Sequence, residues 1–266
     1  MIFKEYKIPS SNNDYIVSVY FIECNTSMED KFYVPDGNLE LMLVNEPVSI
    51  LSGENKILTN EKHIFWGQKR FTGTIEANNH FKVFGIKFQP WLFAFIKEQK
   101  NIDLVDSVLP LNEIMSKPLI KKINQFFKHW NFSDPRLVSI DNLSFALKKE
   151  FNSCIVIKPR FKNIITELRN KKGICSIADL QYMYMQSERT LEYDFKKYIG
   201  ITAKEYQNIV RFRKSCMNLK TTKTIIHTAL DYGYYDQAHF TNYFTKYCQR
   251  SPSKFLNQGN LLLSTV

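Results

Sequence analysis

The residues of this sequence best suited to chemistry are side chains with hydrogen-bonding groups near the end of the chain. Two stretches near the end of the chain place amide, methyl, guanidinium and carboxylate groups at helical spacing, and each of these groups matches a base edge in the major groove. They point outward if Leu191 and Phe240 face inward with the apolar residues that follow them. We predict base contacts from Arg189, Glu192, Tyr193, Gln237, Ala238, Thr241 and Asn242. A solvated helix face is the alternative for any one of them, because phosphate contacts outnumber base contacts.

Positive charge, which phosphate contacts require, is concentrated in the same part of the chain. The protein has 266 residues and a formal net charge of +10. Residues 160–266 contain 17 Lys and Arg against 8 Asp and Glu, whereas residues 1–115 contain 11 against 15. This asymmetry indicates separate roles, although a merely solubilising surface would also be basic. The candidates for phosphate contacts are Lys196, Lys197, Arg211, Arg213, Lys214, Lys223, Lys246 and Lys254.

Residue types that support enzymatic or metal chemistry are not arranged for it. His63 and His80 lie in the strand-rich part without a His-x-His spacing or a matching carboxylate, so we expect no metal site. The five cysteines never show a C-x-x-C spacing, which indicates reduced thiols. Neither G-x-S-x-G nor a phosphate-binding glycine loop occurs. The sequence therefore favours a protein that is not an enzyme and has no cofactor.

The elements that would position the DNA-reading side chains form an internal repeat with an offset of 49 residues. This shift lays Ser187 on Asp236, and both are good N-cap residues. Apolar residues follow each cap on one helical face, namely Leu191, Phe195 and Tyr198 in one copy and Phe240, Phe244 and Tyr247 in the other. Thr202 and Ser251 mark a further cap after each helix. The spacing predicts the same helical unit twice.

A shorter helical run precedes each of these caps and is joined to it by a tight turn. The runs are Ile177–Met183 and Ile225–Tyr232, and Gly233 stands where the second run must stop. This arrangement is a helix-turn-helix, which presents its second helix to the major groove. His239 stands beside the inward Phe240, so we expect a structural role for it. A bundle of repeated helix pairs is the alternative, and the localised positive charge favours double-stranded DNA as the partner.

The first part of the chain predicts a β-barrel or sandwich. Short stretches rich in β-branched and aromatic residues lie at 15–23, 31–34, 38–44, 48–51, 63–65, 73–76 and 81–88, with turn residues between them. Helical spacing takes over after Pro90. Aromatic residues at a barrel mouth suit a small apolar or mixed ligand. The candidates are Phe65, Trp66, Phe84 and Phe88.

The predicted fold class is α+β, in three parts. Residues 1–115 form a β-barrel for sensing or dimerisation, residues 116–158 a helical linker, and residues 159–266 an all-α domain with two helix-turn-helix units. The N-terminus lacks the apolar stretch of a secretion signal, and no apolar run is long enough to span a bilayer. We expect a cytoplasmic protein with no membrane partner.

The stretch Ile177–Phe255 resembles the C-terminal DNA-binding domain of the AraC/XylS family of bacterial transcription regulators. The best-matched segment runs from Ala229 to Phe244 and continues with Ser251, Pro252 and Phe255. The resemblance implies two helix-turn-helix units joined by a long helix, about Ala203–Leu219, that enter successive major-groove segments on one face of DNA. It also implies an activator that contacts RNA polymerase.

The N-terminal half is similar to the cupin-like sensor halves of some of these regulators. The similar segments are Pro35–Leu41 and Phe65–Gln68. They imply a cupin-like β-barrel that binds a small-molecule effector, forms a homodimer, or does both. The alternatives are a cupin-like enzyme fused to a nucleic-acid-binding module and a regulator that needs no ligand.

Several positions depart from the family pattern. Glycine is usual at Met185 and Gln249, alanine at Gln181, and arginine at Tyr193 and Asn242. Glu192 and Asp194 lie beside Tyr193, and we expect them to repel phosphates. The second recognition helix should therefore supply most of the base discrimination, with a preference for A·T pairs.

Overall fold

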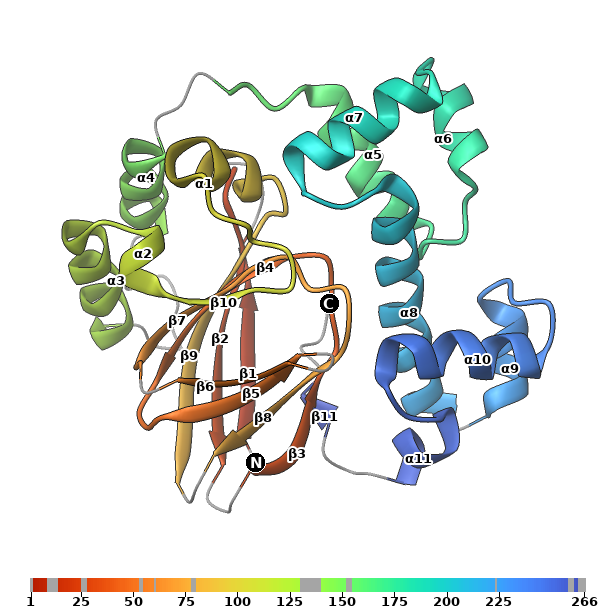
Figure 1. The fold of residues 1–266 in the computed structure, drawn as a ribbon, viewed down its shortest axis with the longest axis horizontal. Helices are drawn as coiled ribbons and strands as arrows, with labels where there is room; N and C mark the ends of the chain where they lie inside the picture. The colour runs from red at the N-terminus through yellow and green to blue at the C-terminus, as the bar shows by residue number, and fades with distance from the viewer. Residues whose placement is uncertain are drawn as a thin grey trace.

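Strands occupy the first part of the chain and helices most of the remainder (Figure 1). The computed structural model describes residues 2–8, 14–24, 28–52, 55–59, 61–77, 80–129, 140–151, 155–222, 224–257 and 261–262. The fold is α+β, as the sequence predicts, with a β-domain followed by a helical domain. Within the described residues, no helix is both long enough and apolar enough to cross a membrane.

Two sheets form the β-domain. Their strands are β1 (Ile2–Lys7), β2 (Ile16–Cys24), β3 (Met28–Tyr33), β4 (Leu39–Val44), β5 (Val48–Ser52), β6 (Asn55–Thr59), β7 (His63–Trp66), β8 (Gly73–Ala77), β9 (Phe81–Phe88), β10 (Val108–Pro110) and β11 (Leu261–Leu262). One sheet has the order β1-β2-β9-β4-β7-β10, and the other has the order β11-β3-β8-β5-β6. Neighbouring strands run antiparallel except β11 and β3, which run parallel.

The larger sheet is buried on both faces, because successive residues of a strand point to opposite sides. On β7, Trp66 belongs to the core between the two sheets, together with Tyr20 and Met42. Its neighbour Phe65 belongs to the core on the other face, which helices cover. The strand therefore lacks the alternation of apolar and polar residues seen in half-exposed sheets.

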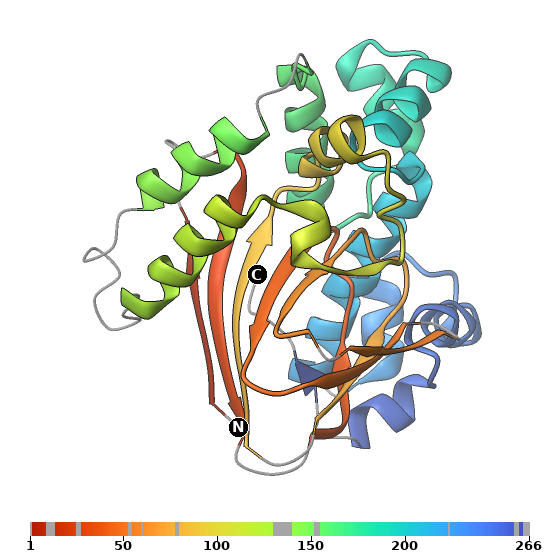
Figure 2. The ribbon, with the colours of Figure 1, turned by 60° about the vertical axis from the view of Figure 1, so that its left-hand side comes forward.

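Four helices cover the outer face of the larger sheet (Figure 2). They are α1 (Leu92–Lys100), α2 (Leu111–Ile114), α3 (Lys117–His129) and α4 (Ile140–Glu150). The buried stripe of α3 consists of Leu119, Ile123, Phe126 and Phe127, at the spacing of one helix face. The opposite face of α3 is exposed and polar.

The helical domain follows. It contains α5 (Pro159–Asn170), α6 (Ile177–Tyr184), α7 (Glu188–Tyr198), α8 (Ala203–Thr222), α9 (Ile225–Asp231), α10 (Gln237–Cys248) and α11 (Pro252–Asn257). The long α8 joins the helix pair α6–α7 to the pair α9–α10 (Figure 1).

The β-domain and the helical domain share a polar and apolar junction. Val34, in the turn after β3, is buried in the core of the second helix pair, with Phe212 and Phe244. Arg213 on α8 donates a hydrogen bond of 3.1 Å to the carbonyl oxygen of Val34. Arg169 on α5 donates one of 2.7 Å to Oδ1 of Asn38. The helical domain therefore rests on the turn between β3 and β4.

Candidate nucleic-acid interface

Helices α6 and α7 form the first helix-turn-helix unit. Oγ of Ser187 accepts a hydrogen bond from the backbone nitrogen of Thr190, at 3.2 Å, and so caps α7. Leu191, Phe195 and Tyr198 are buried, as the repeat predicts. The turn between the helices contains Met185 in the left-handed region, with φ of 48°.

Helices α9 and α10 form the second unit in the same way. Oδ1 of Asp236 accepts from the backbone nitrogen of His239 at 2.6 Å and caps α10. Phe240, Phe244 and Tyr247 are buried beneath it. His239 also accepts a hydrogen bond at Nδ1 from the backbone nitrogen of Tyr235, which gives the imidazole a structural role. The two capped helices present their outer faces to solvent.

The structure exposes most of the predicted base-contacting residues. On α7, Arg189 and Tyr193 are exposed. On α10, Gln237, Ala238 and Asn242 are exposed and Thr241 is half-buried. These side chains therefore lie on accessible faces of the two helices that a helix-turn-helix presents to the major groove.

Glu192 and Asp194 on α7 both have partners within the protein. Oε2 of Glu192 lies 3.3 Å from the backbone nitrogen of Ala203 and accepts a hydrogen bond there, at the start of α8. Asp194 is fully buried and is held by Nζ of Lys158 at 2.8 and 3.1 Å. Burial keeps Asp194 away from DNA phosphates, whereas Glu192 is half-buried and its base contact stays a prediction.

Four of the predicted phosphate contacts are accessible. Lys196, Lys197, Lys246 and Lys254 are exposed on or beside the two units. Nζ of Lys196 lies 4.0 Å from Glu205, an exposed pair of small energetic value. Lys223 lies outside the described residues.

The three other predicted phosphate contacts lie on α8, where Arg213 is buried, whereas Arg211 and Lys214 are half-buried and stay predictions. The guanidinium of Arg211 lies 4.5 Å and 5.2 Å from the ring centres of Tyr234 and Tyr243. Arg213 is buried against the β-domain. Lys214 is half-buried, and burial lowers its pKa, as do the charges of neighbouring cations. Their positions on a basic helix gave no sign of this burial.

The structure also exposes large side chains that the sequence did not single out. Tyr182 at the end of α6, Met185 in the first turn and Tyr235 just before α10 have exposed fractions of 87%, 90% and 88%. Large exposed apolar side chains next to recognition helices are candidates for contacts to DNA or protein. Their proximity to the N-caps Ser187 and Asp236 is the sequence signal that could have identified them.

The four aromatic residues predicted to bind a ligand do not share one site. Trp66 lies between the sheets, 5.3 Å from the ring of Tyr33. Phe65 and Phe88 are buried on the opposite face of the sheet, and Phe84 packs there against Phe127. Phe65, Phe84 and Phe88 hold the helical layer on the sheet, so of these four residues only Trp66 remains a candidate for lining the barrel interior.

The histidines predicted not to bind metal have other partners. Nε2 of His63 lies 3.0 Å from Oδ1 of Asn124, and Nε2 of His80 lies 3.2 Å from Glu23. Within the described ranges, no group of three or more His, Cys, Asp or Glu residues is arranged to hold a metal ion. The four described cysteines are buried free thiols.

Comparisons with known proteins agree with this geometry. A helix-turn-helix domain family matches residues 183–258. An uncharacterised HTH-type transcriptional regulator of Haemophilus influenzae is 24% identical over 261 residues, which cover 90% of this chain and 84% of that protein. Probable transcription factor PqrA of Proteus vulgaris is 30% identical over 107 residues, which cover 40% of this chain and 87% of that protein.

Solved structures share the whole fold. ToxT from Vibrio cholerae superimposes with a TM-score of 0.51 at 13% identity, covering 90% of this chain and 97% of that one. The capped helix pairs and these relatives define a DNA-binding transcriptional regulator of the helix-turn-helix class. The chain belongs to the AraC/XylS family of such regulators.

Proposed function

We propose that this regulator reads its operator with α7 and α10 and that its β-domain senses a small anionic molecule. In this proposal residues 1–115 are the sensor, 116–158 a helical linker and 159–266 the DNA-binding domain. Exposed Arg189, Gln237 and Asn242 on capped recognition helices support the DNA-reading part. Selection of bound fragments from genomic DNA tests it, because a shared motif with two half-sites about one helical turn apart is expected.

The observation that carries the sensing role is an excess of positive charge at the junction. Lys214 on α8 is half-buried, and burial together with the charges of Arg213, Lys7 and Arg169 lowers its pKa. Arg169 donates its hydrogen bonds to neutral oxygens of Tyr206, Gln89 and Asn38. A half-buried cation among other cations is stabilised by an incoming anion.

Two buried carboxylates near the junction pair with lysines of the β-domain. Nζ of Lys87 lies 2.6 Å from Asp36, and Nζ of Lys69 lies 3.1 Å from Glu40, with all four side chains nearly inaccessible. One solved structure of ToxT, with a TM-score of 0.50, contains an unsaturated fatty acid. A long-chain carboxylate is therefore the first effector class to test for this chain.

The test measures the thermal stability of the full chain with oleate. We expect oleate to raise Tm of the wild type, and we expect Lys214→Met to lose most of that shift because the carboxylate loses its partner. Lys100→Met, which removes an exposed lysine from α1, should keep the shift. An equal shift in both variants, or none in the wild type, would favour a regulator that needs no ligand.

The second part of the proposal is activation through contact with RNA polymerase. Ile226 and Leu230 stand one turn apart on α9 and are 51% and 60% exposed, beside the DNA-reading helix. Leu230→Ala should keep operator affinity and lower transcription from a reporter promoter. A homodimer held by the β-domain is a further proposal, and sedimentation across a concentration series measures it.

A further inference from the structure

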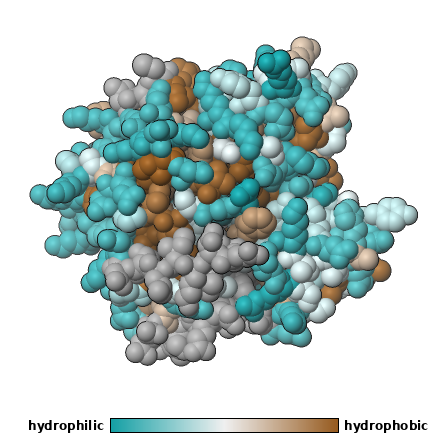
Figure 3. Space-filling model, in the orientation of Figure 1, coloured by the Kyte–Doolittle hydropathy of each residue, from teal (hydrophilic) through white to brown (hydrophobic). Residues whose placement is uncertain are grey.

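The outer face of α3 is a basic surface away from the DNA-binding helices. Its cations are Lys117, Lys121, Lys122 and Lys128, and α3 contains no acidic residue. All four lysines are exposed, and within the described part of the chain none has an ion-pair partner. Hydrophilic side chains cover the left-hand margin of the molecule, where α3 and α4 lie (Figure 3).

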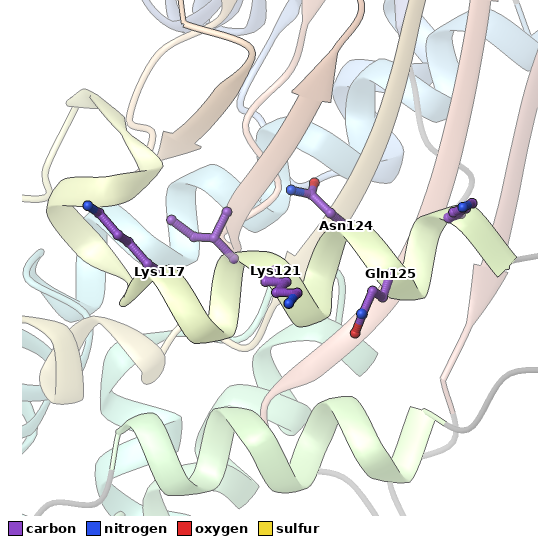
Figure 4. A pocket seen from close by; sticks show the side chains of 6 residues that line it. Lys117, Lys121, Asn124 and Gln125 are labelled. Atoms are coloured by element: carbon purple, nitrogen blue, oxygen red, sulfur yellow. The ribbon is translucent and has the colours of Figure 1, made fainter.

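Two depressions flank this row of lysines. The first has a volume of about 370 Å³ and is lined by Lys117, Ile120, Lys121, Asn124, Gln125 and Lys128 (Figure 4). The second, of about 420 Å³, lies between α3 and α4 and is lined by residues that include Leu119, Lys122, Ala146 and Lys149. Each depression therefore combines apolar side chains with lysines.

Hydrogen bonds fix the positions of two polar neighbours, and Glu150, the carboxylate that lines the second depression, is one of them. Both oxygens of Glu150 accept from Ser116, from its backbone nitrogen and its Oγ, at 2.6 Å each. This carboxylate is thereby fixed at the start of α3. Oδ1 of Asn124 faces Nε2 of His63, which leaves the amide nitrogen of Asn124 as a donor toward the depression.

We propose that this face of α3 binds an acidic amphipathic helix of a partner protein. Lys117, Lys121 and Lys128 are separated by four and seven residues, so their Cα atoms advance by about 6 Å and about 10 Å along the axis. A partner helix with carboxylates at matching intervals can pair with all three. Ile120, half-buried between them, offers an apolar contact to a leucine of that helix.

Other occupants fit this surface less well. A second copy of this chain, related by a two-fold axis along α3, would place lysines against lysines. The apolar residues Leu119, Ile123 and Phe126 are buried in the core, so α3 has little to insert into a lipid surface. Helix α3 and helix α10 lie at opposite margins of the molecule (Figure 1), so DNA on the proposed interface is a poor candidate for this surface.

The experiment uses the full chain and a labelled synthetic helix whose glutamates repeat at the spacing of the three lysines, with leucines between them. Fluorescence anisotropy should show salt-sensitive binding that Lys121→Glu weakens about tenfold. A triple variant, Lys117→Glu with Lys121→Glu and Lys128→Glu, should instead bind the same peptide with lysines in place of the glutamates. Lys100→Glu on α1 is the matched control and should leave binding unchanged.

Several results would overturn the proposal. The proposal fails if the glutamate peptide binds equally to the wild type and to Lys121→Glu. It also fails if the peptide does not bind the wild type at low salt. Lys121-dependent binding of anionic vesicles, of a second DNA duplex or of another copy of this chain, without peptide binding, would assign the surface to that partner instead. Operator affinity should stay unchanged in every variant, so failure here is distinguishable from failure of DNA recognition.

Discussion

Gln237 and Asn242 are the exposed amides of α10, and we expect them to read A·T pairs. Each amide can pair bidentately with adenine, and a good contact is worth roughly 1–3 kcal/mol. Substituting either residue by alanine should relax base preference at one or two operator positions. Binding to a series of single-base operator variants measures this preference.

Arg189 on α7 provides the comparison for these two variants. The same binding series for Arg189→Ala should show a smaller loss of base preference, because the other cations of α7 are placed for phosphates rather than bases. If Arg189→Ala lowers base preference more than either substitution on α10, then α7 and not α10 supplies most of the base discrimination, contrary to our prediction.

Variants of Lys246 and Arg213 distinguish a lysine that contacts DNA phosphate from an arginine that stabilises the fold. Lys246 is exposed on α10, so Lys246→Ala should weaken all DNA sequences alike and lower the slope of log affinity against log salt by about 1. Arg213→Ala should leave that slope unchanged and lower the free energy of unfolding, because the buried carbonyl of Val34 loses its donor. Salt titrations measure the slope, and urea unfolding measures the free energy of unfolding. A changed slope for Arg213→Ala would indicate that Arg213 contacts phosphate.

The turn between α6 and α7 carries local strain that a glycine would remove. Met185 has φ of 48°, where an L side chain is disfavoured by roughly 1–2 kcal/mol. Its side chain is almost fully exposed, so little packing is lost on removal. Met185→Gly should raise the free energy of unfolding by about 0.5–1 kcal/mol, after the greater entropy of glycine in the unfolded chain is included.

In the second helix-turn-helix unit the corresponding turn contains a glycine, so the reverse change, from glycine to alanine, can be made there. Gly233 has φ of +68°, and an added Cβ would meet only Ile174 Cγ2 at an ordinary 3.6 Å. Gly233→Ala should therefore be destabilising through backbone strain without a steric clash. Urea unfolding of both variants checks the pair, and a neutral result for both would remove strain as the explanation.

The helix pairs could be predicted from sequence because their signals are local. Caps at Ser187 and Asp236 and apolar residues at i, i+4 and i+7 lie within single helices, and both helices were found there. Strands β1 and β6 were missed, because both lie at sheet edges, where polar and charged residues weaken the apolar pattern. Short strand β10 has too few residues to show a period.

The burial of α8 could not be predicted, because it depends on contacts from distant parts of the chain. Arg213 looks like a DNA-contacting cation until Val34, 179 residues earlier, is placed against it. Helical periodicity also cannot predict that Asp194 pairs with Lys158, which lies 36 residues earlier. Local patterns thus located the two capped helices but not which charged side chains are already paired with other residues.

At the scale of the whole molecule, the buried pair of Asp36 and Lys87 makes stability depend on pH. Burial alone would raise the pKa of Asp36, but the charges of Lys87, Arg213 and Lys69 lower it below its ordinary value. The stability contributed by this carboxylate is therefore present above the unfolded pKa of about 3.9 and is lost as pH falls toward the folded pKa. Stability should decline steeply below about pH 4 in the wild type.

Asp36→Asn isolates this contribution. The variant should be less stable at neutral pH, since Lys87 loses its charged partner, but its stability should change less between pH 5 and pH 3. Urea unfolding across this range compares the two slopes. Parallel curves would mean that other carboxylates cause the acid sensitivity.

Both recognition helices touch the β-domain, which fixes their relative position. The position of an added Cβ on Gly200, just after α7, lies 2.3 Å from Cζ of Phe93 on α1, so only glycine allows this approach. Near the other end of α8, Phe71 packs against Tyr247 of α10, and the backbone nitrogen of Thr72 donates to the carbonyl of Tyr247. A movement within the β-domain can therefore change the spacing between the two DNA-reading helices.

The parallel pairing of β11 with β3 has a consequence for the order of folding during synthesis. Leu261 pairs with Phe32, so the edge of the smaller sheet is completed by residues that follow the helical domain in the chain. While the ribosome is still adding the helical domain, β3 presents an uncovered edge next to the turn that later supports α8. The sheet can therefore reach its final form only after translation of the last helices, and the nascent β-domain is exposed to strand pairing between chains until then.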